Sequence, residues 1–163
     1  MLAPFHLQKN LIELTKQTAQ AAHEGQKCRI ILKMNTLTDE SLMEALVHAG
    51  QAGVQIDLII RGACILPAQR VGFTDNIRVR SVIGRFLEHS RVFYFASGKD
   101  ESLYLSSADW MNRNMLRRVE LAWPVLELSL RQRLIDECLL AYLHDTRNAW
   151  TLDADGKYRR VEK

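Results

Sequence analysis

Apolar residues recur at helical spacing in two long stretches of the chain. The first, residues 7–24, contains no Gly or Pro and stops before Gly25. The second covers residues 128–143. Apolar positions three or four residues apart share one face of a helix, so both stretches predict amphipathic helices. We expect the second helix to pack on a sheet and the first to act as a connector from an upstream segment.

Two short apolar runs, residues 29–34 and 56–60, have the length of buried strands. Between them Thr38 is expected to cap a helix that ends near Gly50 or Gly53. A strand, a helix and a strand in about thirty residues form a βαβ unit, whose strands run parallel. The chain therefore predicts an α/β fold with parallel strands at its centre.

The rest of the chain predicts further strands and one terminal hairpin. The loop 97–101 has hairpin length, so the strands on either side of it are expected to be antiparallel. A mixed β-sheet flanked by helices on both faces follows. The expected strands are residues 77–83, 91–96, 102–106 and 119–125, and the tail from residue 150 forms a small hairpin.

Domain boundaries follow from this pattern. We expect a connector helix over 1–26 from a preceding domain, an α/β domain over 27–150, and a C-terminal hairpin or tail over 151–163. No apolar run reaches the roughly 20 residues that span a bilayer, and the start lacks the pattern of a signal peptide. Three widely spaced cysteines without a CxxC pair predict reduced thiols and a cytoplasmic protein.

Polar residues gather at one predicted edge of the sheet. Parallel strands direct their carboxyl ends to a common edge, where open α/β sheets usually bind ligands. Asn35 and Arg61 follow the two parallel strands, and His89 precedes the strand at 91–96. Folding back the hairpin brings His89 towards Ser107 and Asp109. Arg61 requires an anionic partner, either a ligand or an internal carboxylate such as Asp57 or Asp109.

Positive charge is concentrated in the middle of the chain. Residues 61–118 contain ten Lys plus Arg against five Asp plus Glu, whereas the remainder contains twelve against fourteen. Nine of those ten cations are arginine, whose planar guanidinium suits phosphate. No GxxxxGK[ST] loop occurs, so a phosphate site would depend on side chains. An arginine-rich solvated surface is the alternative reading of the same charge.

Five segments in order resemble the C-terminal part of bacterial polyphosphate kinase, and the likeness runs from about residue 3 to the end. Several long motifs at consistent spacing make the resemblance specific. The segments are KMNTL at 33–37, IIRGAC at 59–64, DNIRVRS at 75–81, GRFLEHSR at 84–91 and YLSSADWMNRN at 104–114.

The resemblance implies the second of two phospholipase D-like domains in an enzyme that reversibly transfers the terminal phosphate of ATP to polyphosphate. That reaction would pass through a phosphohistidine in the preceding domain and use Mg²⁺ held mainly outside this chain. By the same likeness Arg61 and Arg118 contact phosphate, and His89 contacts phosphate and serves catalysis. The upstream domains are needed, so this chain alone is expected to be inactive. A homo-oligomer is also expected.

Two other functions remain open from the residues. A polyanion-binding module would hold polymer without chemistry. A phospholipase- or nuclease-like half-site is the other enzyme reading, although Arg91 stands where the His-x-Lys motif of those enzymes has lysine. Few aromatic residues lie where they would stack on bases, so nucleic acid is not an expected partner.

Overall fold

The computed structural model describes residues 2–3, 6–62, 64–82, 91–111 and 120–161. Within these residues nine strands form one mixed sheet with the order β1-β7-β6-β5-β2-β3-β4-β8-β9. The strands are β1 (Leu2–Ala3), β2 (Cys28–Met34), β3 (Gln55–Ile60), β4 (Ile77–Val82), β5 (Arg91–Ser97), β6 (Asp100–Ser106), β7 (Glu120–Pro124), β8 (Ala149–Leu152) and β9 (Tyr158–Arg160).

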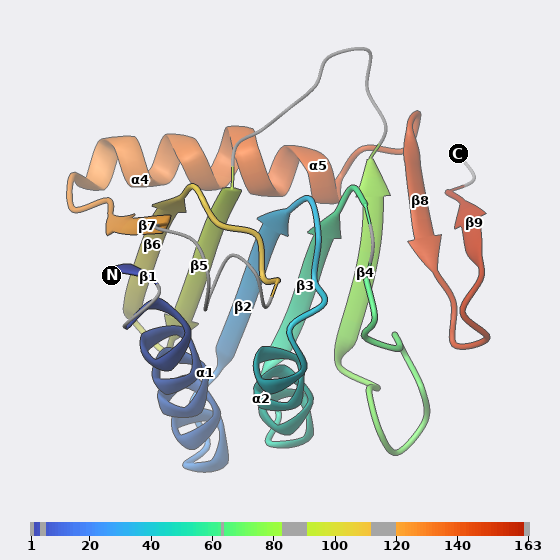
Figure 1. Cartoon of the computed structure of the whole chain (residues 1–163), viewed down its shortest axis with the longest axis horizontal. Coiled ribbons are helices and arrows are strands. Elements are labelled where there is room, and N and C mark those ends of the chain that lie inside the picture. Colours follow the sequence, from blue (N-terminus) through green and yellow to red (C-terminus); the bar gives the residue numbers. More distant parts are fainter. Residues whose placement is uncertain (1, 4–5, 63, 83–90, 112–119, 162–163) are drawn as a thin grey trace.

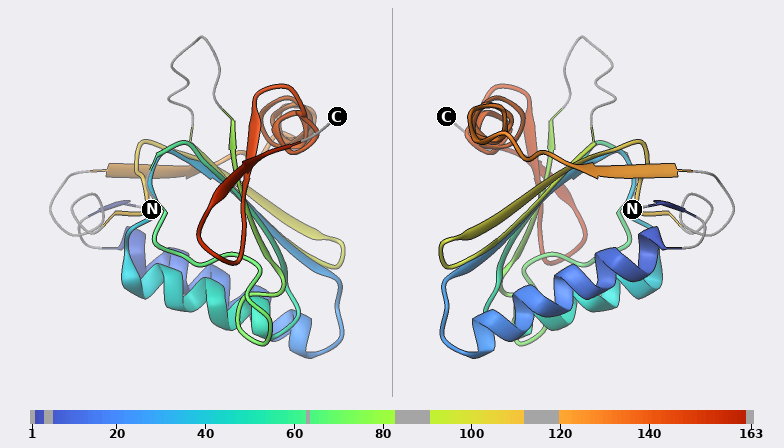
Figure 2. Two further views of the ribbon diagram at one scale, coloured as in Figure 1. Left: turned by 90° about the vertical axis from the view of Figure 1, so that its right-hand side faces the viewer. Right: turned by 90° about the vertical axis from the view of Figure 1, so that its left-hand side faces the viewer.

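Helices cover both faces of this sheet (Figures 1 and 2). On one face lie α1 (Leu7–His23) and α2 (Glu40–Gln51), which pack against each other. The other face carries one long C-terminal helix made of α4 (Leu128–Leu134), the π-helical segment η1 (Ile135–Leu140) and α5 (Ala141–Leu143). The predicted α/β class is therefore confirmed, and the third predicted helix contains a π-helical stretch in its middle.

The alternation of side chains along the strands explains why the sheet has a core on each of its two faces. Alternate residues of a strand point to opposite faces. Leu32 of β2 and Leu58 of β3 belong to the core beneath α1 and α2, whereas Ile31 and Ile59 belong to the core beneath the C-terminal helix. Both faces of the central strands are buried, which is why their sequences are mostly apolar. Apolar runs of this kind are typical of parallel strands.

The βαβ unit is confirmed, because β2 and β3 pair in parallel with Lys33 opposite Ile59. Its helix begins differently from the prediction. The N-cap is Asp39, whose carboxylate accepts a hydrogen bond of 3.0 Å from the Leu42 amide, and Thr38 lies outside the helix. An aspartate at this position also places negative charge at the positive end of the helix, so the prediction of a Thr38 cap is wrong by one residue.

The two predicted hairpins are also present. Strands β5 and β6 are antiparallel and stay paired as far as Ser97 and Asp100, so the connecting turn is shorter than the loop predicted over 97–101. At the far edge β8 pairs with β4 and with β9, both antiparallel. The terminal hairpin is thus an extension of the main sheet. No helix among the described residues is long and apolar enough to cross a membrane.

Candidate functional site

The carboxyl ends of β2, β3, β4 and β6 lie at one edge of the sheet, where β5 begins. Backbone hydrogen bonds connect the loops that follow three of these strands. The Trp110 amide donates to the Thr36 carbonyl at 3.1 Å, and the Thr38 amide donates to the Trp110 carbonyl at 2.8 Å. Leu37 forms bridges with both Cys64 and Trp110. These contacts fix the positions of the loops before any ligand arrives.

Asp109 is the central acceptor at this edge. Its Oδ1 accepts hydrogen bonds from the Asn35 amide at 2.8 Å and from Arg91 Nε at 3.0 Å, and its Oδ2 accepts from the same guanidinium at 3.2 Å. Only 7% of the Asp109 surface is exposed. The carboxylate therefore joins the end of β2, the start of β5 and the loop after β6.

Arg61, directly after β3, is exposed at the same edge. The two carboxylates considered as its internal partners are engaged by other residues. Asp57 accepts hydrogen bonds of 3.0 and 3.3 Å from Arg29, and Asp109 pairs with Arg91. In the part of the chain that the structure describes, no carboxylate forms a salt bridge with Arg61. Within that part of the chain, its guanidinium charge is not neutralised by a carboxylate and can meet an anion from solvent.

Gly62 allows the two parallel strands to approach closely beyond their ends. Its amide donates to the Asn35 carbonyl at 2.6 Å. A Cβ atom at this position would lie 2.8 Å from the same oxygen, closer than real Cβ contacts come. Glycine is required here because the neighbouring atom belongs to the backbone and cannot move aside cheaply. The close approach holds Arg61 beside Asn35, as the sequence predicts.

A small hollow of about 30 Å³ lies beside Arg61, with Lys33 and Tyr142 among its lining residues. Lys33 is buried, with 6% of its surface exposed, and its Nζ atom lies 3.9 Å from the centre of the Tyr142 ring. A cation over the face of an aromatic ring is stabilised electrostatically. The hollow has about the volume of one water molecule, so a phosphate group would meet Arg61 at the open edge.

His89 and Arg118 lie outside the described residues, so the structure brings together Asn35 and Arg61 of the predicted set. Sequence reasoning missed the ion pair of Arg91 with Asp109 and the contact of Lys33 with Tyr142. The signal for Lys33 was its charge inside a mostly apolar strand. Tyr142 gave no such signal, because an aromatic residue on an amphipathic helix looks like ordinary core.

The described residues contain no group of three or more His, Cys, Asp or Glu side chains that could hold a metal ion. Asp109, the buried carboxylate at this edge, is occupied by Arg91 and the Asn35 amide. These residues therefore do not fit a Mg²⁺ site of their own. Nearby, burial raises the pKa of the Cys64 thiol above its ordinary value of 9.0, against a smaller lowering by a hydrogen bond with the Leu66 backbone.

Comparison with known proteins agrees with this architecture. The family model described as "Polyphosphate kinase C-terminal domain 2" matches residues 1–163. The polyphosphate kinase of Pseudomonas aeruginosa is 53% identical over 159 residues, which cover 98% of this chain and 23% of that protein. This chain thus spans about a quarter of the length of the curated relatives that it matches.

Solved structures give the same result. The crystal structure of polyphosphate kinase from Porphyromonas gingivalis superimposes with a TM-score of 0.95 at 35% identity, covering 100% of this chain and 25% of that one. Yeast tyrosyl-DNA phosphodiesterase superimposes with a TM-score of 0.53 at 13% identity over 76% of this chain and 31% of that one, a likeness of fold alone. The chain belongs to the polyphosphate kinase family and corresponds to the second C-terminal domain of its members.

Proposed function

We propose that this domain supplies the cationic half of an active site that transfers the terminal phosphate of ATP reversibly to polyphosphate. The single observation that carries the proposal is the position of the Arg61 side chain. Its guanidinium is exposed at the carboxyl edge of the sheet, and Asp57 and Asp109, the two acids considered as its partners, are held by other arginines. Membership of the polyphosphate kinase family supports the choice of substrates.

The proposed reaction has two steps. A histidine of the preceding domain attacks the γ-phosphorus of ATP, a P–N bond forms, and the bond to the oxygen bridging to the β-phosphate breaks, releasing ADP. A terminal oxygen of polyphosphate then attacks the same phosphorus, the P–N bond breaks, and the histidine is restored. Reversal of both steps makes ATP from polymer.

The residues of this chain act on the charge that develops in these steps. Phosphoryl transfer is governed mainly by positioning and by stabilising the oxygens of the transferred group. Arg61 and Arg118 would bind those oxygens, and His89 would donate a proton or a charge-assisted hydrogen bond to the leaving oxygen. Magnesium, if used as the family resemblance implies, would be held by residues outside the described part of this chain.

The test is made in the full-length polypeptide that carries this domain, because the domain alone is expected to be inactive. Arg61→Ala should lower kcat/KM for ATP by about 10²- to 10³-fold, the effect of removing one preorganised transition-state donor. Arg61→Lys keeps the charge but loses the bidentate geometry and should recover part of the loss. Arg133→Ala removes an exposed cation from α4 and serves as the matched control. Transfer by Arg61→Ala at the level of this control would refute the assignment.

A binding module without chemistry predicts a different kinetic result. His89→Ala would then weaken polymer binding and leave turnover at saturating substrate unchanged. In the catalytic proposal the same substitution lowers kcat, because the missing contact is made to the leaving oxygen in the transition state. Measuring kcat and KM separately for His89→Ala decides between the two.

A further inference from the structure

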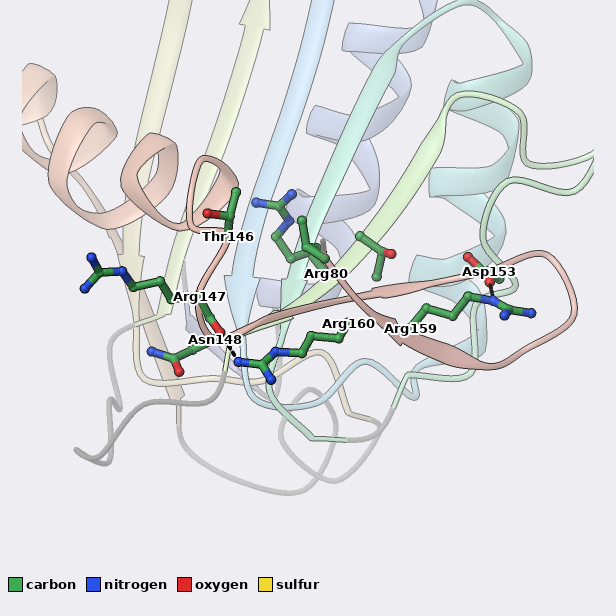
Figure 3. Close-up of a pocket in the computed structure, with 9 residues that line it drawn as sticks. Arg80, Thr146, Arg147, Asn148, Asp153, Arg159 and Arg160 are labelled. Carbon is green, nitrogen blue, oxygen red and sulfur yellow. Dashed lines mark hydrogen bonds and ion pairs between the residues drawn. The ribbon is translucent and has the colours of Figure 1, made fainter. Parts of the chain in front are cut away.

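A second basic surface lies at the far end of the sheet, where β4, β8 and β9 meet. This surface contains an open hollow of about 1180 Å³, and four arginines are among the residues that line the hollow. Figure 3 shows Arg160 reaching towards the backbone of Arg147, while Arg159 lies beside Asp153 further along the hairpin. Arg80 projects from β4 behind them. We call the hollow lined by Arg80, Arg147, Arg159 and Arg160 the hairpin hollow.

The positive charge of the hairpin hollow is only partly neutralised. Asp153 is the acidic residue among its described lining, and it pairs with Arg159. Arg80 donates to backbone carbonyls at the end of α5, including Tyr142 at 3.1 Å and Asp145 at 3.2 Å. Carbonyl groups orient the guanidinium without cancelling its full charge. The hollow therefore keeps an excess of positive charge.

Arg147 and Arg160 carry most of this excess at the surface. Both side chains are exposed, and Arg160 Nη2 donates to the Arg147 carbonyl at 3.1 Å. Among the residues that the structure describes, no carboxylate forms a salt bridge with either of them. This bond holds the Arg160 guanidinium at the Arg147 backbone, and the two exposed charges favour the arrival of an anion at this surface.

Strand register gives the separation between the hollow and the edge that carries Arg61. One row of paired residues crosses five neighbouring strands, from β2 to β9. Four strand spacings give a length of about 19 Å for this row. Cations occupy its two ends and its middle, but Lys33 and Ile59 lie buried beneath the C-terminal helix, so the row measures the separation of the two sites and is not an open groove. The row consists of Lys33, Ile59, Arg80, Thr151 and Arg159.

The shape and chemistry of the hairpin hollow fit a chain of phosphates better than they fit other anions. A single phosphate would occupy only a small part of a hollow of about 1180 Å³. No aromatic residue is among the described lining of the hairpin hollow, so it lacks the stacking surfaces that single-stranded nucleic acids use. Arginine side chains with their forked donors are suited to successive phosphate groups.

We propose that the hairpin hollow is a second polyphosphate-binding site, which holds a distal part of the polymer while its end reacts at the Arg61 edge. This inference rests on the proposed function for the identity of the polymer. It assigns to Arg147 and Arg160 a role in retaining long chains, separate from the chemistry. Short chains that reach only the Arg61 edge would not use this site.

The experiment uses the full-length polypeptide with the double substitution Arg147→Ala and Arg160→Ala. Binding of long-chain polyphosphate is measured by titration at two salt concentrations, next to tripolyphosphate. We expect the affinity for the long chain to fall about tenfold and its salt dependence to weaken, because charge-assisted contacts are lost. Affinity for tripolyphosphate and KM for ATP should stay within about twofold of the unaltered protein.

Two further variants make the result specific. Lys9→Ala with Lys16→Ala removes the same charge from exposed positions on α1, across the sheet, and should leave polymer binding unchanged. Arg147→Lys with Arg160→Lys keeps the charge and should retain part of the affinity, which also shows that the hairpin folds. Unchanged long-chain affinity in the alanine variant, an equal loss in the α1 variant, or an equal loss for a single-stranded oligonucleotide would each overturn the proposal.

The outcome is separable from that of the proposed function. If Arg61→Ala leaves phosphate transfer intact while the hairpin variant loses long-chain binding, the second site stands and the catalytic assignment fails. If Arg61→Ala abolishes transfer and the hairpin variant binds long chains normally, the catalytic assignment stands and the second site fails.

Discussion

Arg91 and Asp109 form a paired hydrogen bond, with Nε to Oδ1 at 3.0 Å and Nη2 to Oδ2 at 3.2 Å, between the start of β5 and the loop after β6. The same carboxylate accepts from the Asn35 amide. One partly buried ion pair thus determines how three segments meet at the proposed site. This relationship makes Asp109 a positioning residue, since it acts on the site through Asn35 and Arg91.

Asp109→Ala should destabilise the protein and disorder the edge. Removing a carboxylate with three hydrogen bonds leaves a largely buried guanidinium without this partner, at a cost of about 3 kcal/mol in the free energy of unfolding. Urea denaturation measures this loss. Glu137→Ala, which breaks an exposed ion pair on the C-terminal helix, should cost less than about 0.5 kcal/mol. Similar losses for the two variants would contradict the role given to Asp109.

Gly62→Ala should damage the site through the backbone. The added methyl group would lie 2.8 Å from the Asn35 carbonyl oxygen and would push the two strand ends apart, costing about 1 to 3 kcal/mol. Gly50→Ala is the comparison, because its methyl group would meet a side-chain carbon of Ile77 at 3.2 Å, which can shift. We expect Gly62→Ala to lower both stability and ATP affinity, and Gly50→Ala to change ATP affinity little. A Gly62→Ala protein with unchanged stability would show that the loop relaxes freely.

The strands and helices could be predicted where a short stretch of sequence determines them. The runs at β2 and β3 are mostly apolar because both faces are covered, and Gly25 and Gly53 adopt positive φ values of 90° and 108° just beyond the two helices. The helix cap was misplaced because Thr38 and Asp39 are both good capping residues. Only the contact between Thr38 and Trp110, 72 residues later, excludes the threonine.

The site was less predictable, since its geometry depends on pairings across the sheet. Sequence reasoning placed Arg61 and Asn35 at the same edge from the rule for parallel strands. It left Asp57 and Asp109 as possible partners of Arg61, because competition from Arg29 and Arg91 depends on strand register. The hairpin hollow was missed for the same reason: Arg80 and Arg159 come together only because β8 inserts between β4 and β9.

Lys33→Met should weaken ATP binding without unfolding the protein. Lys33 is buried near Arg61 and contributes positive potential to the edge, while a methionine of similar volume avoids the cost of burying a charge. We expect the free energy of unfolding to change by less than about 1 kcal/mol. Lys27→Met removes the same charge from an exposed position before β2. KM for ATP should rise in Lys33→Met alone. Equal KM values in the two variants would show that the charge of Lys33 does not contribute to ATP binding.

The reactivity of the Cys64 thiol measures whether the loop after β3 stays packed. Burial raises the pKa of its thiol above 9.0, so less thiolate is present at pH 8 than on an ordinary exposed cysteine. Alkylation by iodoacetamide, followed by mass spectrometry of the Cys64 peptide, should therefore be slower than alkylation of N-acetylcysteine. The rate should keep rising as the pH passes 9. In Gly62→Ala the opened loop should react faster at pH 8, whereas Gly50→Ala should react like the unaltered protein. A Cys64 rate equal to that of the free thiol would mean that the loop contacts with Leu37 and Leu66 do not persist in solution.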